Sequence, residues 1–296
     1  MTFRPEGTFT ALVTPMQRDE PRSLDLDALE RVVEQQIAGG IDGLVACGTT
    51  GESVTLSDDE WATVVQSTIR FARGRVPVIA GTGTNSTQKT IQLSHKAVQM
   101  GADALLIVTP YYNKPSQIGL LAHYRAVAAA VQAPIILYNV PGRTGCNLLP
   151  ATVAELAQVP NIVAVKEAAG SLEQVLELCR LVPPDFFVLS GEDALCVPLY
   201  SVGGHGVISV VSNPAPAQTA ALYRDFRAGK IDQAAKGQQA LHPLIKTLFS
   251  EPNPQPAKMA MHLLGLMNPD LRLPLVNANE QTTQALRRDL RALGLL

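Results

Sequence analysis

Short runs of apolar residues recur along the first three-quarters of the chain, and each is followed by a segment in which apolar positions repeat with helical period. A run rich in β-branched residues and without polar alternation is typical of a strand buried in a parallel sheet. Eight strands are predicted, at residues 9–13, 43–47, 76–80, 104–108, 135–137, 162–165, 187–189 and 206–210. Helices are predicted between and after them, at residues 26–38, 58–73, 87–100, 120–131, 152–157, 172–181, 194–201 and 215–227.

Strict alternation of strand and helix, repeated eight times without a linker or a change in composition, favours a closed (β/α)8 barrel (TIM barrel) over an open sheet. From residue 231 onward the pattern is helical only, with segments at 231–249, 257–264 and 280–293 separated by proline-rich turns. We therefore expect an α/β protein with a (β/α)8 barrel over residues 1–230 and a C-terminal helical extension over residues 231–296.

Composition narrows the classes of function. A chain of 296 residues with 46% hydrophobic content can bury a large core. The net charge of -2, without any basic run, argues against nucleic acid or membrane surfaces as partners. No apolar run could span a bilayer and the N-terminal segment has no apolar signal core, so a cytoplasmic location is expected. The four cysteines and five histidines are scattered without metal-ligand spacing, so no metal is expected.

Active sites of (β/α)8 barrels lie at the carboxyl ends of the strands. The fifth predicted strand ends in Tyr138, and the sixth ends in Lys166 followed by Glu167. A charged lysine is costly to bury, so two interpretations of Lys166 are open. In the first it extends to solvent and pairs with Glu167; in the second it is a buried amine that acts as a nucleophile.

Other strand ends carry polar groups of the same kind. Residues 48–52, GTTGE, could bind a small carboxylate or form a capped turn. Tyr111 and Tyr112, flanked by prolines, suit either a site or a subunit interface. Arg143 could hold a carboxylate or remain a solvated loop charge. The glycines at 203–206 keep a phosphate site, and hence a pyridoxal phosphate enzyme, as a rival interpretation.

Together, a lysine, a phenol, a carboxylate-binding turn and an arginine suit imine formation with a small keto acid. The imine withdraws electrons, so the adjacent carbon loses a proton and attacks an aldehyde without a metal or an organic cofactor. Tyr138 is the natural group to move protons while the imine forms and breaks.

Five motifs occur in a characteristic order: GTTGE, TPYYNKPS, YNVPGRTG, AVKEAAG and GGHGVIS. With them, nearly the whole chain resembles the dihydrodipicolinate synthase family of the pyruvate-dependent lyase superfamily. The resemblance implies condensation of pyruvate with L-aspartate 4-semialdehyde, in lysine and diaminopimelate synthesis, by a cofactor-free homotetramer built as a dimer of dimers. Related enzymes include N-acetylneuraminate lyase and sugar-acid aldolases or dehydratases, and the arginine of YNVPGRTG is the more specific mark of the synthases.

The resemblance also implies a binding site for pyruvate. Lys166 would form the imine, and Thr50 with the neighbouring backbone amide would hold the pyruvate carboxylate. Gly191 and Ile208 would line the pocket.

For the remaining steps, the resemblance implies a proton relay of Tyr138, Thr49 and Tyr112, in which Tyr112 comes from a neighbouring subunit. Arg143 would bind the carboxylate of aspartate semialdehyde. Dimerisation would then be part of the active site.

Some members of the family are inhibited by lysine at a dimer interface. The matching positions here are Ser53, Val54, Asp58, Trp61, Asn85, Lys89 and Tyr111. Sensitive members usually have histidines in place of Asp58 and Trp61, and a glutamate in place of Lys89. Because Lys89 would repel the ammonium group of a bound lysine, weak or absent inhibition is expected.

Two alternatives stay open beside the synthase. A sugar-acid aldolase, a dehydratase or a lyase of the N-acetylneuraminate type would keep the imine chemistry and accept another aldehyde. A non-catalytic paralogue would keep only the barrel.

Overall fold

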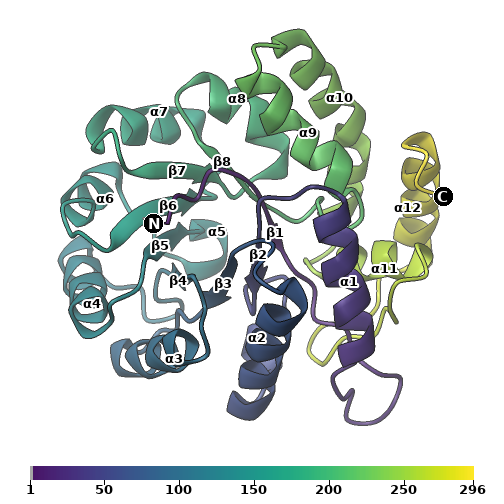
Figure 1. Ribbon diagram of the computed structural model, residues 1–296, viewed down its shortest axis with the longest axis horizontal. Helices are drawn as coiled ribbons and strands as arrows, with labels where there is room; N and C mark the ends of the chain where they lie inside the picture. Colours follow the sequence, from purple (N-terminus) through teal and green to yellow (C-terminus); the bar gives the residue numbers. More distant parts are fainter. Residues whose placement is uncertain (1–2) are drawn as a thin grey trace.

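Eight parallel strands pair in chain order and close into a barrel in the computed structural model, which describes residues 3–296 (Figure 1). The predicted (β/α)8 fold is therefore confirmed. Residues 1 and 2, with which the expected barrel segment begins, lie outside the described residues. The strands are β1 Gly7–Ala11, β2 Gly43–Ala46, β3 Val78–Gly81, β4 Ala104–Val108, β5 Ile135–Asn139, β6 Ile162–Glu167, β7 Phe187–Ser190 and β8 Gly206–Ser209.

A ring of helices surrounds the barrel (Figure 1). These helices are α1 Leu26–Ala38, α2 Asp58–Ala72, α3 Thr87–Gln99, α4 Gln117–Ala130, α6 Pro150–Leu156, α7 Leu172–Leu181, α8 Cys196–Ser201 and α9 Pro216–Arg227. The short helix α5 Pro141–Thr144 follows β5 directly and lies behind the barrel in Figure 1, outside this ring. Two short 3-10 turns, Ser53–Thr55 and Asp193–Leu195, follow β2 and β7. Side-chain caps define several starts: Ser57 begins α2 with a capping box, and Ser171 accepts a hydrogen bond from the backbone N–H of Gln174 at the start of α7.

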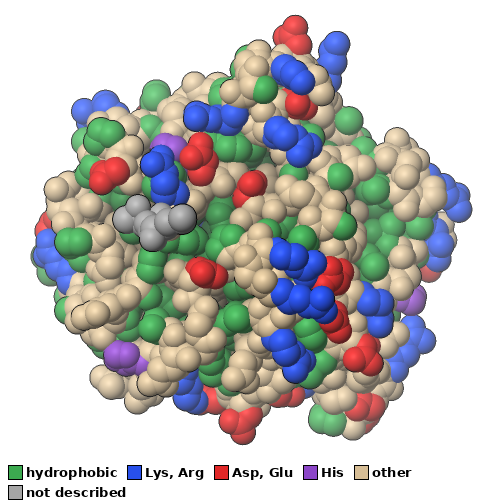
Figure 2. All heavy atoms as spheres, in the orientation of Figure 1, with side chains coloured by type: hydrophobic (Ala, Val, Ile, Leu, Met, Phe, Trp, Pro, Cys, Tyr) green, Lys and Arg blue, Asp and Glu red, His purple; other side chains and the backbone are tan. Residues whose placement is uncertain are grey.

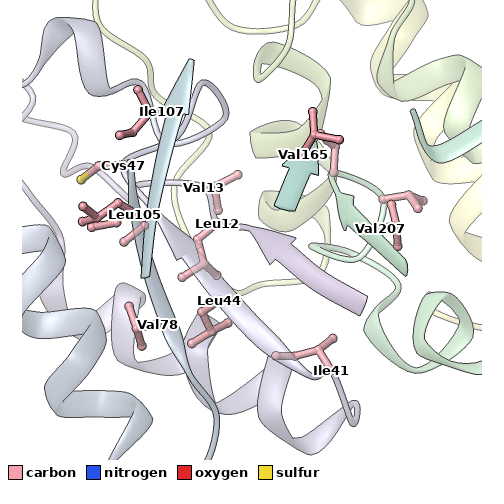
Figure 3. Packing of buried hydrophobic residues seen from close by; sticks show 14 of the residues in the cluster. Leu12, Val13, Ile41, Leu44, Cys47, Val78, Leu105, Ile107, Val165 and Val207 are labelled. Atoms are coloured by element: carbon pink, nitrogen blue, oxygen red, sulfur yellow. The ribbon is translucent and has the colours of Figure 1, made fainter. Parts of the chain in front are cut away.

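The side chains of each strand alternate between two apolar layers, as parallel barrel strands require. One layer fills the barrel and includes Phe9, Ile79 and Leu189. The other lies between strands and helices, where Figure 3 shows Leu44 and Leu105 among the buried side chains. Because both faces of each strand are buried away from solvent, the strands appear in the sequence as continuous apolar runs.

The last three helices pack beside the barrel. They are α10 Ile231–Leu248, α11 Gln255–Leu263 and α12 Glu280–Ala292. Helix α10 packs on α9, and α12 packs on both α10 and α11, so the three form a layer next to α1 and α9 (Figure 1). Within residues 3–296 no helix combines the length and apolar character needed to cross a membrane.

The N-terminal segment closes the amino end of the barrel. Arg4 stacks on the ring of Phe187, the first residue of β7, with 5.3 Å between the guanidinium carbon and the ring centroid. Figure 2 views the molecule from this end and shows acidic and basic side chains interspersed across it. The opposite end, where the strands finish, carries the polar side chains singled out in the sequence.

Candidate active site

Lys166 and Tyr138 are neighbours at the carboxyl ends of β6 and β5. The two residues are paired in the strand register, so their side chains point to the same side, into the barrel. Lys166 is 5% exposed, and its Nζ lies 4.2 Å from the centroid of the Tyr138 ring. Among the described residues, this amine makes no hydrogen bond or ion pair with protein. Lys166 is therefore a buried amine held against a phenol ring.

Glu167 points away from Lys166, to the outer side of the barrel wall. Its carboxylate accepts hydrogen bonds from Asn139 Nδ2 at 3.0 Å, from Gln174 Nε2 at 3.0 Å and from the backbone N–H of Ala169 at 2.7 Å. Burial raises the pKa of Glu167, and these donors oppose the shift. The interpretation in which Lys166 reaches solvent and pairs with Glu167 is therefore wrong, because alternation along β6 sends the two side chains to opposite faces.

A cavity of about 240 Å³ opens at the carboxyl end of the barrel beside Tyr138. Thr49 and Arg143 also line it, as do Ser53 and Tyr111. The structure thus brings together three residues that the sequence predicted for the site, from the ends of β2 and β5. No hydrogen bond joins Tyr138 to Thr49 within residues 3–296, although both contribute to the wall of the same cavity.

The turn at residues 48–52 presents unpaired backbone donors. The N–H of Gly51 donates to Gly48 O and the N–H of Glu52 donates to Thr49 O, each at 3.1 Å. In the part of the chain that the structure describes, the N–H groups of Thr49 and Thr50 have no acceptor. Unpaired N–H groups are free to donate to an anion, so this turn suits a carboxylate.

Gly191 lies beside the lysine, and neither Gly191 nor Ile208 is in the lining of the cavity. A Cβ atom on Gly191 would stand 2.6 Å from the Cβ of Ala168 and 3.1 Å from Cε of Lys166, so only glycine leaves room for the lysine side chain. Ile208 is fully buried in the apolar layer inside the barrel. Gly191 therefore limits the space of Lys166, and Ile208 belongs to the apolar layer inside the barrel.

Arg143 stands on the short helix α5, which the sequence pattern did not reveal. Its side chain is exposed and, among the described residues, has no ion-pair partner. Glu192 is a nearby acid: burial and the adjacent Asp193 raise its pKa, while Lys166 and Arg143 oppose that shift. An unpaired guanidinium at the cavity wall is well suited to bind a carboxylate.

Tyr112 is not part of this cavity. It is 88% exposed and has a left-handed backbone, with φ of 75°. Tyr111, its neighbour, turns inward and lines the cavity instead. The chain alone therefore does not assemble the expected relay of Tyr138, Thr49 and Tyr112.

A second cavity, of about 150 Å³, adjoins the first and shares Tyr111 and Gly81 with it. It is lined by most of the positions expected for lysine regulation: Ser53, Val54, Asp58, Trp61, Lys89 and Tyr111. Asn85 is absent from this lining. Lys89 is paired with Asp58 at 3.6 Å, and both side chains are more than half exposed.

Two contacts from the C-terminal extension could not be foreseen from the sequence. Asn253 Nδ2 donates to Thr50 Oγ1 at 2.9 Å, and Lys258 Nζ of α11 donates to Glu52 Oε1 at 2.7 Å. More than 200 residues separate the partners in each pair. The only signal was a lysine within the apolar segment of α11. Among residues 3–296, no three His, Cys, Asp or Glu side chains gather as metal ligands would.

The fold and the site define a class of protein: a (β/α)8-barrel enzyme with a buried lysine and a cavity at the carboxyl ends of its strands. Residues 4–293 match the dihydrodipicolinate synthetase family. The chain belongs to this family, so the resemblance inferred from its motifs is confirmed.

Individual relatives match along their full length. The 4-hydroxy-tetrahydrodipicolinate synthase of Syntrophus aciditrophicus is 48% identical over 291 residues, covering 98% of this chain and 99% of the relative. The crystal structure of dihydrodipicolinate synthase from Thermotoga maritima has a TM-score of 0.96 at 44% identity, covering 98% and 99% of the two chains. The chloride-inhibited synthase from Acinetobacter baumannii, complexed with pyruvate, has a TM-score of 0.96 at 43% identity, with the same coverage.

Proposed function

We infer that the chain is a 4-hydroxy-tetrahydrodipicolinate synthase, a lyase that condenses pyruvate with L-aspartate 4-semialdehyde in lysine and diaminopimelate synthesis. The observation that carries this conclusion is the full-length match to synthases near 48% identity. The buried, unpaired amine of Lys166 beside Tyr138 supports it. The roles of the individual residues are our proposals, based on the geometry of the site.

In the first step, the Lys166 amine attacks the ketone carbon of pyruvate, and loss of water gives an imine. The carboxylate of pyruvate would be held by the turn at residues 48–52, through the N–H groups of Thr49 and Thr50 and the Thr50 hydroxyl. Gly191 and Ile208 would limit the space around the imine. These contacts fix the keto acid against the lysine, so the reaction becomes effectively unimolecular.

Protons move while the imine forms and while the enamine attacks the aldehyde. Tyr138 is placed for this work, because its ring lies against Lys166 and its side chain lines the cavity. Thr49, on the wall of the same cavity, would extend the relay toward Tyr112 of a neighbouring subunit. Arg143 would bind the carboxylate of aspartate semialdehyde as a two-pronged donor.

The assembly that we propose is a homotetramer, built as a dimer of dimers. The exposure of Tyr112 at the rim of the site supports a dimer in which this phenol reaches the cavity of the partner. The completed relay would then depend on association of subunits.

The function is tested by following pyruvate consumption with aspartate semialdehyde and, in matched reactions, with sugar-derived aldehydes. We expect turnover with aspartate semialdehyde only. Turnover with a sugar-derived aldehyde instead would move the protein to a sugar-acid branch of the superfamily.

Two variants make the assay specific. Lys166→Arg keeps the charge but cannot form the imine, so borohydride with pyruvate should no longer modify the protein.

Arg143→Ala should raise the KM for aspartate semialdehyde by about tenfold or more, since it removes a charged hydrogen bond. Pyruvate trapping on Lys166 should persist in that variant. An Arg143→Ala enzyme with unchanged KM would contradict the role of this arginine.

Weak or absent inhibition by lysine remains our expectation for the second cavity. A lysine ligand would bring its ammonium group near Lys89, and Asp58 offsets that repulsion only partly, because both side chains are solvated. In a steady-state assay, sub-millimolar lysine should leave the rate unchanged. Strong inhibition at that concentration would contradict this expectation, whereas Lys89→Glu should introduce sensitivity.

A further inference from the structure

The carboxylate-binding turn is bracketed by two strained residues. Cys47, at its start, and Glu52, at its end, both have left-handed backbone, with φ of 54° and 53°. This conformation is disfavoured for residues with a side chain and persists only where the surroundings hold it. Something outside the turn must therefore fix its shape.

The C-terminal extension provides that support. Lys258 and Glu52 form an ion pair at 2.7 Å, with 0% and 2% of their side chains exposed. The second carboxylate oxygen of Glu52 accepts from the backbone N–H of Arg272 at 3.4 Å. On the barrel side, the Thr14 hydroxyl donates to Gly51 O at 2.7 Å. The turn is thus held by hydrogen bonds from the C-terminal extension on one side and from Thr14 on the other. Glu52 is the buried residue through which the extension holds it.

Asn253 contacts the turn at the hydroxyl of Thr50, the group proposed to bind the pyruvate carboxylate. Its Nδ2 donates to Thr50 Oγ1 at 2.9 Å in a buried contact. A threonine hydroxyl has one hydrogen to donate. Since the oxygen of Thr50 already accepts from Asn253, the hydrogen is free, and within residues 3–296 no protein group accepts it.

We propose that Asn253 is a positioning residue for pyruvate: by donating to Thr50, it leaves the Thr50 hydroxyl as a donor to the pyruvate carboxylate. The inference rests on the proposed function and adds a residue of the extension to it. Thr50 O–H and the free N–H groups of Thr49 and Thr50 then form one set of donors for one anion. Asn253 acts through Thr50 and makes no contact with substrate itself.

The substitution that tests this is Asn253→Asp, which keeps the size of the side chain and reverses the hydrogen bond. A carboxylate at this position would accept the Thr50 hydrogen and place negative charge beside the substrate carboxylate. The KM for pyruvate should rise by about tenfold or more, since a hydrogen bond to a charged group is lost. The kcat at saturating pyruvate should stay within about threefold of the parent value, because Lys166 and Tyr138 are untouched.

Asn253→Ala decides the question if Asn253→Asp does not fold. It removes the donor without adding charge, so the freed Thr50 hydroxyl loses its fixed orientation. We expect a rise of roughly threefold to fivefold in the KM for pyruvate. An unchanged KM in this variant overturns the proposal.

Thr247→Val is a matched control within the extension. Thr247 Oγ1 donates to Asp289 Oδ2 at 2.6 Å in a buried contact between α10 and α12, away from the turn. This variant should melt at a lower temperature with an unchanged KM for pyruvate. If all three variants lose stability and kcat in parallel and KM does not move, Asn253 is merely structural and the proposal fails.

Trapping with borohydride at increasing pyruvate concentration, without the second substrate, separates this proposal from the function itself. Failure of the parent protein to be trapped would refute the imine function. Trapping of the parent and of Asn253→Asp with the same half-saturating pyruvate concentration would refute only the positioning role.

Discussion

Gly191 determines how much room the buried lysine has. Its backbone N–H donates to Glu167 O at 2.7 Å, which fixes the chain after β7 against the end of β6. At that distance a side chain on Gly191 would meet both Ala168 and Cε of Lys166. The glycine is required for a close approach rather than for an unusual backbone angle.

Gly191→Ala should therefore reduce activity more than stability. A displacement of Lys166 by about 1 Å costs roughly a hundredfold in rate, whereas the added methyl group costs about 1–3 kcal/mol of stability. The measurement is kcat with aspartate semialdehyde, with a melting curve alongside. Gly142→Ala is the control, because a Cβ there meets no atom within 4 Å. A Gly191→Ala enzyme with the parent kcat would contradict this account.

The sequence could single out the residues of the candidate site that end barrel strands. Tyr138 and Lys166 were found because a polar side chain at the end of an apolar run is conspicuous, and the barrel topology brings such ends together. Asn253 and Lys258 were not found. Their partners lie more than 200 residues away, and no local pattern encodes a contact over that separation.

Among the elements, helices were predicted best where a cap and an amphipathic face coincide. The bounds of α1 and α7 agree with the prediction, and each begins after a capping side chain. Helix α5 was missed because a four-residue segment, Pro141–Thr144, is too short to display a helical period. Strand β1 begins at Gly7 rather than at residue 9, because pairing with β8 aligns Gly7 with Gly206.

A salt bridge joins α2 to the segment before α12. Arg272 Nη1 donates to Glu60 Oε2 at 2.7 Å and Nη2 donates to Oε1 at 2.5 Å. This two-pronged bond lowers the pKa of Glu60 from 4.5 to about 2. The unfolded chain thus binds a proton between these values that the folded chain does not. The contribution of Glu60 to stability is complete above pH 4.5 and is lost as the pH falls toward 2.

Glu60→Gln should reveal this dependence. The difference in free energy of unfolding between the parent and the variant should shrink by about 1 kcal/mol from pH 7 to pH 4. Urea unfolding at the two pH values measures it. Glu30→Gln, which breaks the exposed pair with Arg73, is the control and should have a much smaller effect. A Glu60→Gln difference that is equal at both pH values would refute the linkage.

For the whole molecule, the position of Tyr112 gives a test of assembly. If the phenol acts in the partner's site, the Lys166→Ala chain is inactive and the Tyr112→Phe chain is nearly so, but the two complement one another when mixed. In a mixed dimer, the intact lysine of one chain meets the intact tyrosine of the other. A random mixture should recover roughly a quarter of the parent activity.

The opposite result, no activity in the mixture, would show that Tyr112 does not act in the partner's site. A tyrosine acting within its own chain would leave every mixed dimer inactive, because neither chain is then complete. Tyr112→Phe alone should lower kcat by roughly a hundredfold, as expected for a lost proton relay. Light scattering should give about four times the chain mass of 31.6 kDa, and a monomeric protein would contradict the proposed assembly.

The lining of the second cavity includes Trp61, the single tryptophan of the chain. Trp61 Nε1 donates to Gly81 O at 3.0 Å, and Gly81 borders both cavities. The emission of a buried indole depends on its hydrogen bond and on nearby water, so the tryptophan emission of this protein comes from one known place. Because Gly81 lines both cavities, a compound in either one would lie beside the residue whose carbonyl accepts the indole hydrogen bond. The molecule thus contains its own optical probe, bonded to a residue that borders both cavities.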